Sequence, residues 1–217
     1  MADEAARMID AVVYDFGGVF MPSPFEAIRR TADERGIEFE ELLAIVFGSY
    51  DEDTDHPWHQ VERGELALQV AREQITLLGA ERGHEIELYD VLKSMGGGGV
   101  IEEMVDNVRR VRAAGRKTAV LTNNLREVRD FWRAMIPLDE LFDVVVDSHE
   151  VGMRKPNPAI YLHTLELLGG IAPERAAFLD DFAGNVAAAD ALGMVGILVE
   201  VDPTAAIARV DALLAQP

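Results

Sequence analysis

The spacing of apolar residues divides the chain into a first strand, a helical stretch and a region in which strands and helices alternate. Residues 11–16 form a mostly apolar run that ends at Gly17 and Gly18, which is typical of a buried strand followed by a turn. From about residue 22 to 95, apolar residues recur three and four positions apart, and this spacing predicts helices. The pattern is clearest over residues 25–35, 38–47 and 64–78.

The glycines at 96–99 mark a change of pattern. Four glycines in a row predict a hinge or loop, since ordering glycine costs more backbone entropy than ordering any other residue. Beyond them, short apolar runs predict strands over residues 117–121, 143–146, 176–179 and 195–199. Helical spacing predicts helices from 101 to about 115, through 131–132, and over 158–168, 186–192 and 204–214.

This alternation predicts an α/β fold. Parallel strands that are apolar along their whole length need helices on both faces, so we expect a Rossmann-like, doubly wound parallel sheet. The first strand belongs to that sheet, and residues 21–98 therefore form an all-helical cap inserted after it. Residues 1–20 and 99–217 would make up the core. A chain of 217 residues fits one domain with an insert, and it is long enough to bury a core without disulfides.

Composition narrows the function. The chain has 39 Asp and Glu residues against 20 Lys and Arg, a formal net charge of −19, so nucleic acid and anionic membranes are poor partners. It has no cysteine, which excludes disulfides, thiolate metal sites and cysteine nucleophiles. The first ten residues are acidic rather than signal-like, and no long apolar run occurs. We expect a soluble cytoplasmic protein; its oligomeric state is not readable.

Polar side chains stand at or just after the carboxyl ends of the predicted strands. Asp15 closes the first strand, Thr122 the second, and Asp180 and Asp181 the fourth, while Lys155 follows the third after a short loop. Open parallel sheets bind ligands at this edge. Carboxylates with a lysine and a hydroxyl predict a site for an anion and a divalent cation, and hard oxygen ligands favour Mg²⁺ over zinc.

The segments that hold these residues resemble, in order, the four motifs of the haloacid dehalogenase superfamily. They are Asp15-Phe16-Gly17-Gly18-Val19, Leu121-Thr122-Asn123-Asn124, Arg154-Lys155-Pro156 and Leu179-Asp180-Asp181. The helical insert is similar to the type-one cap of that superfamily. Within it, the sequence resembles the phosphatase-like domains of soluble epoxide hydrolase and of some acyl-CoA dehydrogenases.

The resemblance implies a Mg²⁺-dependent phosphatase that acts on a small phosphorylated metabolite. Asp15 would be the nucleophile and would form an aspartyl-phosphate. Asp15, Asp180 and Asp181 would hold the metal, together with the backbone carbonyl of Gly17. Asn185 would orient the water around the metal from outside its coordination shell.

The same resemblance implies a set of phosphate contacts. Lys155 would place a fixed ammonium beside the reacting groups, so that the negative carboxylate and phosphate can approach each other. Thr122 would act with it in catalysis and bind phosphoryl oxygens. Asn123 and Gly18 would complete the phosphate-binding set.

Gly17 departs from the pattern, because most phosphatases of the superfamily carry there an aspartate that serves as general acid and base. Such assistance is typically worth ~10²–10⁴ in rate. We hypothesise that activity favours good leaving groups, namely aryl, acyl or anomeric phosphates. Alternatively, a cap residue such as His56 or His59 donates the proton.

Two other functions stay open. The chain could be a fold-retaining domain that has lost turnover and serves binding or regulation, a reading that Gly17 alone supports. It could also be a haloacid dehalogenase, in which the same aspartate attacks carbon without a metal. The acid pair Asp180 and Asp181 argues against dehalogenation.

The aromatic residues suggest packing more than chemistry. We expect residues 56–65 to form a loop that leads into a cap helix, with Trp58 in the cap core rather than on the substrate. Phe131 and Trp132 are adjacent on a predicted core helix. We expect both to pack inside, although an exposed pair would mark a dimer surface.

Overall fold

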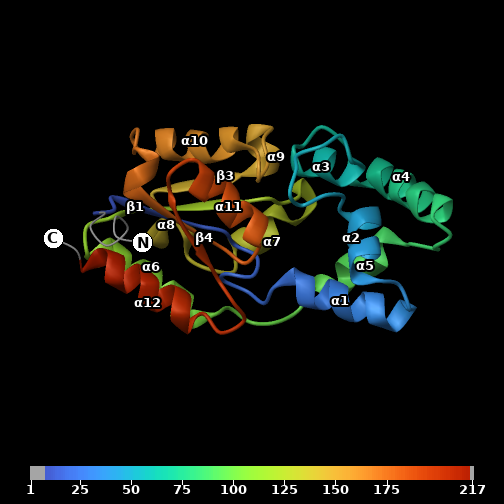
Figure 1. Cartoon of the computed structure of the whole chain (residues 1–217), viewed down its shortest axis with the longest axis horizontal. Helices are drawn as coiled ribbons and strands as arrows, with labels where there is room; N and C mark the ends of the chain where they lie inside the picture. The colour runs from blue at the N-terminus through green and yellow to red at the C-terminus, as the bar shows by residue number, and fades with distance from the viewer. Residues whose placement is uncertain (1–7, 216–217) are drawn as a thin grey trace.

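A parallel sheet forms the centre of the larger half of the molecule in the computed structural model, which describes residues 8–215 (Figure 1). Its strands are β1 (Ala11–Tyr14), β2 (Lys117–Thr122), β3 (Val144–Asp147), β4 (Ala176–Asp180) and β5 (Val195–Leu198). The strand order is β3-β2-β1-β4-β5, and each neighbouring pair is parallel. The predicted doubly wound, Rossmann-like α/β fold is confirmed.

Helices cover both faces of the sheet because successive strand residues point to opposite sides. Val12 and Tyr14 face a core shared with α6, α8 and α12, whereas Ala11 and Val13 face α10 and α11. Figure 1 places α10 on one side of the sheet and α6 and α12 on the other. These helices are α6 (Glu102–Ala113), α8 (Leu138–Leu141), α10 (Pro158–Leu167), α11 (Ala183–Ala191) and α12 (Thr204–Leu214).

The helices between β1 and α6 lie beside the sheet and have a hydrophobic core of their own (Figure 1). They are α1 (Pro24–Arg35), α2 (Phe39–Val46), α3 (Pro57–Glu62), α4 (Leu68–Glu81) and α5 (Leu88–Met95). We call these helices and their connecting loops the cap. Its division from the core at residues 21 and 98 stays a prediction, and residues 1–7 and 216–217 of the predicted core lie outside the described residues.

Helix α3 contradicts the loop predicted over residues 56–65. Pro57 occupies the first turn, where its missing N–H costs nothing, and the ring of His56 caps the helix by accepting a hydrogen bond from the Trp58 N–H. The loop begins only at Arg63. A capping histidine is uncommon, which is why the sequence did not mark this helix start.

The region after β2 begins irregularly and then forms a short helix. The helix predicted through residues 131–132 is present as the short α7 (Arg129–Arg133), and a 3₁₀ helix, η2 (Arg126–Val128), directly precedes it. The Asn124 side chain accepts from the Leu125 N–H, and Ser148 accepts from the Asn124 N–H. These two N–H groups therefore donate hydrogen bonds to side chains and not to helix carbonyls.

The remaining short elements are α9 (Ser148–Val151) and η3 (Pro173–Arg175). Helix α11 begins at Ala183, three residues before the predicted start at 186. The Asp180 carboxylate accepts from the Phe182 N–H just ahead of that helix. Among residues 8–215, no helix combines the length and apolar character needed to span a bilayer.

Candidate active site

The predicted site residues gather at the carboxyl edge of the sheet. Asp15 directly follows β1, the central strand, and its N–H continues the pairing with β4 by donating to the Leu179 carbonyl at 2.8 Å. Thr122 ends the neighbouring β2, and Asp180 ends β4. Chain order reverses on either side of β1, which is where open parallel sheets bind ligands.

Lys155 joins two of the carboxylates. Its ammonium Nζ lies 2.8 Å from Asp15 Oδ1 and 2.6 Å from Asp180 Oδ2. The side chain is 1% exposed. Burial acts to lower the pKa of Lys155, but the two carboxylates outweigh it and raise the pKa above its usual value. Lys155 therefore stays charged beside the candidate nucleophile.

Asn123 fixes the backbone of Lys155. Its Oδ1 accepts from the Lys155 N–H at 2.8 Å, and its Nδ2 donates to the Lys155 carbonyl at 3.0 Å. Both ends of the amide are thus used within the protein. The predicted contact between Asn123 and phosphate would have to come from its backbone N–H.

The three aspartates form a compact acidic cluster. Asp15, Asp180 and Asp181 each offer a carboxylate oxygen, and these oxygens lie within 4.8 Å of one another. Burial, the charge of Asp180 and the charge of Asp15 raise the pKa of Asp181 to about 8. Burial also raises the pKa of Asp15, to about 6, although Lys155 acts against it. One ammonium does not balance the charge of three carboxylates, two of them buried and one partly buried, so the cluster favours a cation.

Other groups around the cluster fit Mg²⁺ and its water. Asn185 donates from Nδ2 to both oxygens of Asp180, at 3.2 and 3.0 Å, while its own buried Oδ1 has no hydrogen-bond partner among the described residues. A metal-bound water would satisfy that oxygen. At Gly18, with φ of 72°, a Cβ would lie 2.1 Å from Asp181 Oδ2, so only glycine leaves room for this carboxylate.

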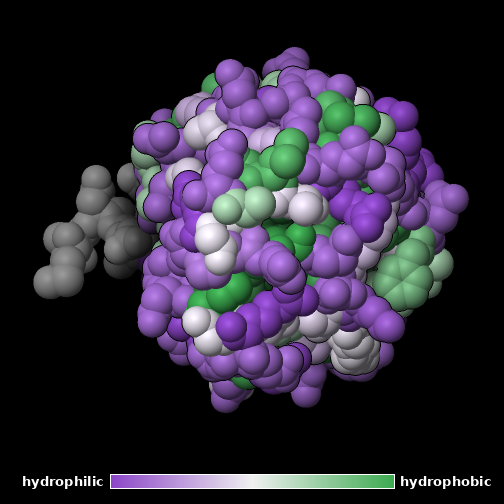
Figure 2. Space-filling model, turned by 90° about the vertical axis from the view of Figure 1, so that its right-hand side faces the viewer, coloured by the Kyte–Doolittle hydropathy of each residue, from purple (hydrophilic) through white to green (hydrophobic). Residues whose placement is uncertain are grey.

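A cavity of about 280 Å³ opens above these residues. Its floor includes Asp15, Lys155, Asp181 and Thr122. The Thr122 hydroxyl makes no hydrogen bond to another group within residues 8–215. Its walls are largely apolar and come from both the cap and the core: Met21, Pro22, Pro24, Phe25, Tyr50, Trp58, Leu92, Met95, Leu125, Val128, Phe131, Met135 and Phe182. The outer face of the cap end is mainly hydrophilic by contrast (Figure 2).

Sequence reasoning missed the aromatic wall. Phe25, Tyr50 and Phe182 pack together, with ring centroids 5.0 to 5.3 Å apart. Phe25 and Tyr50 belong to the cap, whereas Phe182 follows the acidic pair of the core. Their separation in sequence hid the cluster; the one local signal was Phe182 directly after Asp181.

The two cap histidines do not reach the cavity, so the hypothesis that one of them donates the proton is wrong. Nδ1 of His56 accepts from the helix backbone, and Nε2 lies 3.2 Å from the Ile45 carbonyl. His59 is fully buried, and burial lowers its pKa to about 3. Neither ring lines the cavity.

The other aromatic predictions divide. Trp58 is 4% exposed and packs edge-on against Phe47, which confirms a place in the cap core, and it also lines the cavity. Trp132 is buried against Phe16 and donates to Asp147. Phe131 does not pack inside: it is 69% exposed and lines the cavity mouth.

Comparison with known proteins identifies the family. Residues 9–193 match the model of the haloacid dehalogenase-like hydrolases. The chain is 30% identical over 216 residues to acyl-CoA dehydrogenase family member 10 of Mus musculus, covering 97% of this chain but 20% of that protein. It is 28% identical over 203 residues to the sesquiterpene phosphatase astK of Aspergillus oryzae, covering 86% of this chain and 88% of that protein. The chain therefore belongs to the haloacid dehalogenase-like hydrolases.

Solved structures show the same fold. A haloacid dehalogenase family enzyme of Bacteroides thetaiotaomicron, in complex with magnesium and inorganic phosphate, is 19% identical with a TM-score of 0.59. That match covers 89% of this chain and 96% of the other. The L-2-haloacid dehalogenase of Xanthobacter autotrophicus is 21% identical with a TM-score of 0.58, covering 91% and 81%. The fold is thus common to metal-containing and dehalogenating members of the family.

Proposed function

We propose that this protein is a Mg²⁺-dependent phosphatase that hydrolyses a small phosphorylated metabolite through an aspartyl-phosphate on Asp15. The observation that carries the proposal is the ammonium of Lys155 between Asp15 and Asp180, with Asp181 beside them. A site with three carboxylates, one cation and a free hydroxyl suits a phosphate together with a divalent metal. The phosphatase among its relatives supports the same reaction class.

Asp15 attacks the phosphorus, and the bond to the leaving oxygen breaks. The Asp15 side chain is 12% exposed and reaches the cavity, while Lys155 holds one of its oxygens and neutralises part of its charge. Thr122 donates its hydroxyl to a phosphoryl oxygen. Mg²⁺ bound by Asp15, Asp180, Asp181 and the Gly17 carbonyl would supply the further positive charge that phosphoryl transfer needs.

Gly17 has no side chain that could protonate the leaving oxygen. A Cβ placed there would touch only the Pro24 ring, at 3.9 Å, so the position has space but no acidic group. Because the cap histidines are not available, leaving groups that depart without a proton are favoured. Aryl, acyl and anomeric phosphates meet this requirement.

The alcohol part of the substrate is largely apolar. Apart from its charged floor, the cavity presents mainly carbon atoms, and Phe131 extends this surface to the mouth. Burial of an apolar group there contributes about 25 cal/mol per Å². A highly charged sugar phosphate would gain little from these walls, and the net charge of −19 would oppose its approach.

Two alternatives are less well supported. For a binding domain without turnover, the charged groups of the site would have no reason to be arranged around Asp15, and Gly17 is the one departure in the motifs. For a haloacid dehalogenase without a metal, the acidic cluster would be a burden. Burial, together with repulsion from Asp180, raises the pKa of the nucleophile Asp15, and burial and the neighbouring carboxylates also raise the pKa of Asp181.

The test is a panel of phosphorylated metabolites and p-nitrophenyl phosphate, assayed with Mg²⁺ and with EDTA, alongside 2-chloropropionate. We expect Mg²⁺-dependent phosphate release, greatest with aryl and apolar substrates, and none from Asp15→Asn. Chloride release from 2-chloropropionate would favour dehalogenation. No turnover of any compound, despite binding of phosphate, would favour a binding domain.

A further inference from the structure

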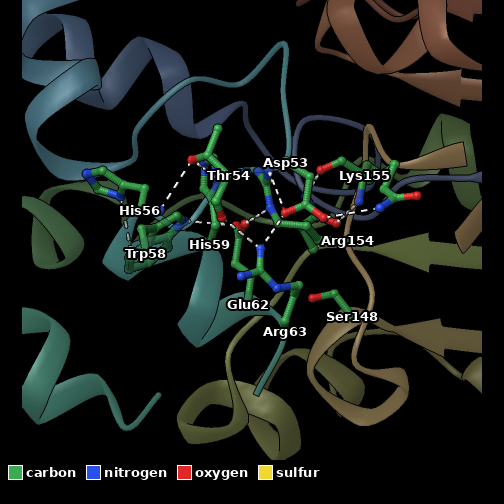
Figure 3. Close-up of polar contacts among 12 residues, drawn as sticks. Asp53, Thr54, His56, Trp58, His59, Glu62, Arg63, Ser148, Arg154 and Lys155 are labelled. Atoms are coloured by element: carbon green, nitrogen blue, oxygen red, sulfur yellow. Dashed lines mark hydrogen bonds and ion pairs between the residues drawn. The ribbon is translucent and has the colours of Figure 1, made fainter. Parts of the chain in front are cut away.

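A buried ion pair joins the cap to the loop that carries Lys155 (Figure 3). Glu62, the last residue of α3, is 3% exposed, and Arg154 is fully buried. Arg154 Nε donates to Glu62 Oε2 at 2.7 Å, and the Trp58 indole N–H donates to Glu62 Oε1 at 2.9 Å. Both carboxylate oxygens of Glu62 therefore accept hydrogen bonds, one from Arg154 of the core and one from Trp58 of the cap.

Stability alone is a poor reason for such a pair. Removing two charges from water costs about as much as their attraction returns, and apolar replacements are often equally stable. Here the arrangement is also incomplete: Arg154 donates from Nη1 to the Glu52 carbonyl at 3.2 Å, but its buried Nη2 has no partner among the described residues. What the pair does supply is fixed geometry between two parts of the molecule.

The two ends of this connection both reach the cavity. Trp58 and Glu62 line it from the cap, and Lys155, the residue after Arg154, lines it from the core. The Lys155 backbone is held by Asn123 on the core side, as described above. On the other side, the preceding residue is held by Glu62.

The connection lies away from the covalent links between cap and core. Those links lead into α1 and out of α5, and the Ile101 N–H ties them together by donating to the Phe20 carbonyl at 2.9 Å. Figure 1 shows α3 next to α9, well separated from these links. At that contact, a Cβ on Gly64 would lie 2.6 Å from the His149 carbonyl, so the two backbones are in close contact. Glu62 and Arg154 thus connect the cap to the core at a place far from the chain segments that link them covalently.

We propose that Glu62 and Arg154 are positioning residues that set the Lys155 ammonium in register with the cap wall of the cavity. The proposal rests on the phosphatase function proposed above. A substrate that packs against Trp58 is thereby aligned with the residues that receive its phosphate. Loss of the pair loosens the tie between the Lys155 backbone and the cap, while Asn123 still holds that backbone and Asp15 and Asp180 still bind the ammonium. We therefore expect the reacting geometry to change more than substrate binding does.

The test compares Glu62→Gln and Arg154→Met with the parent, using p-nitrophenyl phosphate and Mg²⁺. We expect kcat to fall roughly 10- to 100-fold, since small misplacements of catalytic groups carry penalties of this order, with KM changed less than about 3-fold. Glu87→Gln is the control: it breaks the Arg72–Glu87 ion pair, which lies wholly within the cap. It should leave both constants as in the parent.

A double variant, Glu62→Leu with Arg154→Met, separates positioning from folding. An apolar pair should restore the thermal midpoint that a single variant loses, while kcat stays low. Recovery of kcat together with the midpoint would show a merely structural pair and overturn the proposal, as would single variants that match Glu87→Gln. An inactive parent would overturn the phosphatase function and this proposal with it, whereas an active parent with unaffected variants would overturn this proposal alone.

Discussion

The floor and the walls of the cavity differ in origin and in chemistry. The floor comes from the carboxyl edge of one sheet and is charged: Lys155 lies 2.8 and 2.6 Å from the carboxylates of Asp15 and Asp180. The walls come mostly from the cap and from loops, and they are apolar. From this difference we expect the groups at the sheet edge to determine the reaction, and the apolar walls from the cap and the core loops to determine the choice of substrate.

The floor should be most sensitive to loss of its ammonium. Lys155→Met leaves three carboxylates without their cation, and we expect kcat to fall roughly 10²–10³-fold, the usual loss for one preorganised electrostatic group. Steady-state kinetics with p-nitrophenyl phosphate would measure it. Lys93→Met, at an exposed position of the cap, is the control. Equal effects of the two variants would contradict a special role for the floor.

A second substitution, Gly17→Asp, adds the proton donor that the floor lacks. Gly17→Asp should speed hydrolysis of alkyl phosphates by about 10²-fold, because a proton donor matters most for poor leaving groups. Aryl phosphates should respond little. Gly17→Asn has nearly the same shape but donates no acidic proton, so it serves as the control. If alkyl phosphates are hydrolysed no faster by Gly17→Asp than by the parent, the missing relay does not limit the enzyme.

The acidic cluster predicts a pH dependence of stability in metal-free protein. The folded pKa values of Asp181, about 8, and Asp15, about 6, lie above the ordinary carboxyl value of 3.8. At these two carboxyls the folded state therefore binds more protons than the unfolded state between about pH 4 and 8, and their contribution to stability falls as pH rises through this window. The lowered pKa of His59 acts in the opposite direction, but only below the ordinary histidine value of 6.5. The melting temperature should drop by at least about 2–4 °C, the shift that 1 kcal/mol gives in a domain of this size.

Thermal unfolding in EDTA from pH 5 to 8.5 would measure this dependence. Asp181→Asn removes the group with the larger shift and should flatten the curve. Added Mg²⁺ should stabilise the protein most at the upper end of the range. The same pH profile in the parent and in Asp181→Asn would contradict the assignment of these three carboxylates to one cluster.

The smallest effect on catalysis is expected at Phe131, at the mouth of the cavity. Phe131→Ala should raise KM for aryl phosphates a few-fold and leave glycerol phosphate unchanged, because the exposed ring contacts only the outer part of a ligand. Stability should stay within about 0.5 kcal/mol, as is usual for surface positions. Leu162→Ala, at a 46% exposed position on α10, is the control. A matching loss for both substrates would mean that Phe131 does not discriminate.

The same contrast explains what the sequence could predict. The strands are short apolar runs, and parallel strands place their carboxyl ends at one edge, so the approach of Asp15, Lys155 and the acid pair followed from local patterns. Partners that depend on how the cap folds onto the core did not follow. The pairing of Glu62 with Arg154 spans more than ninety positions, and neither residue carries a local signal for it.

The cap also shows where local reading fails for a physical reason. His56 and His59 looked like donors because histidine titrates near neutral pH, yet one caps a helix and the other is desolvated in the cap core. Phe131 and Trp132 are adjacent in sequence and have opposite surroundings. In each case burial, which depends on tertiary packing, decided the outcome.

The central claim is that Asp15 is a nucleophile assembled with a cation and Lys155. Calorimetric titration with beryllium fluoride, a mimic of the phosphoryl group on aspartate, tests it without any assumption about the substrate. With Mg²⁺ present, the parent should bind one equivalent, while EDTA, Asp15→Asn or Lys155→Met should abolish or strongly weaken binding. Binding of equal strength in the parent and in Asp15→Asn would contradict the claim.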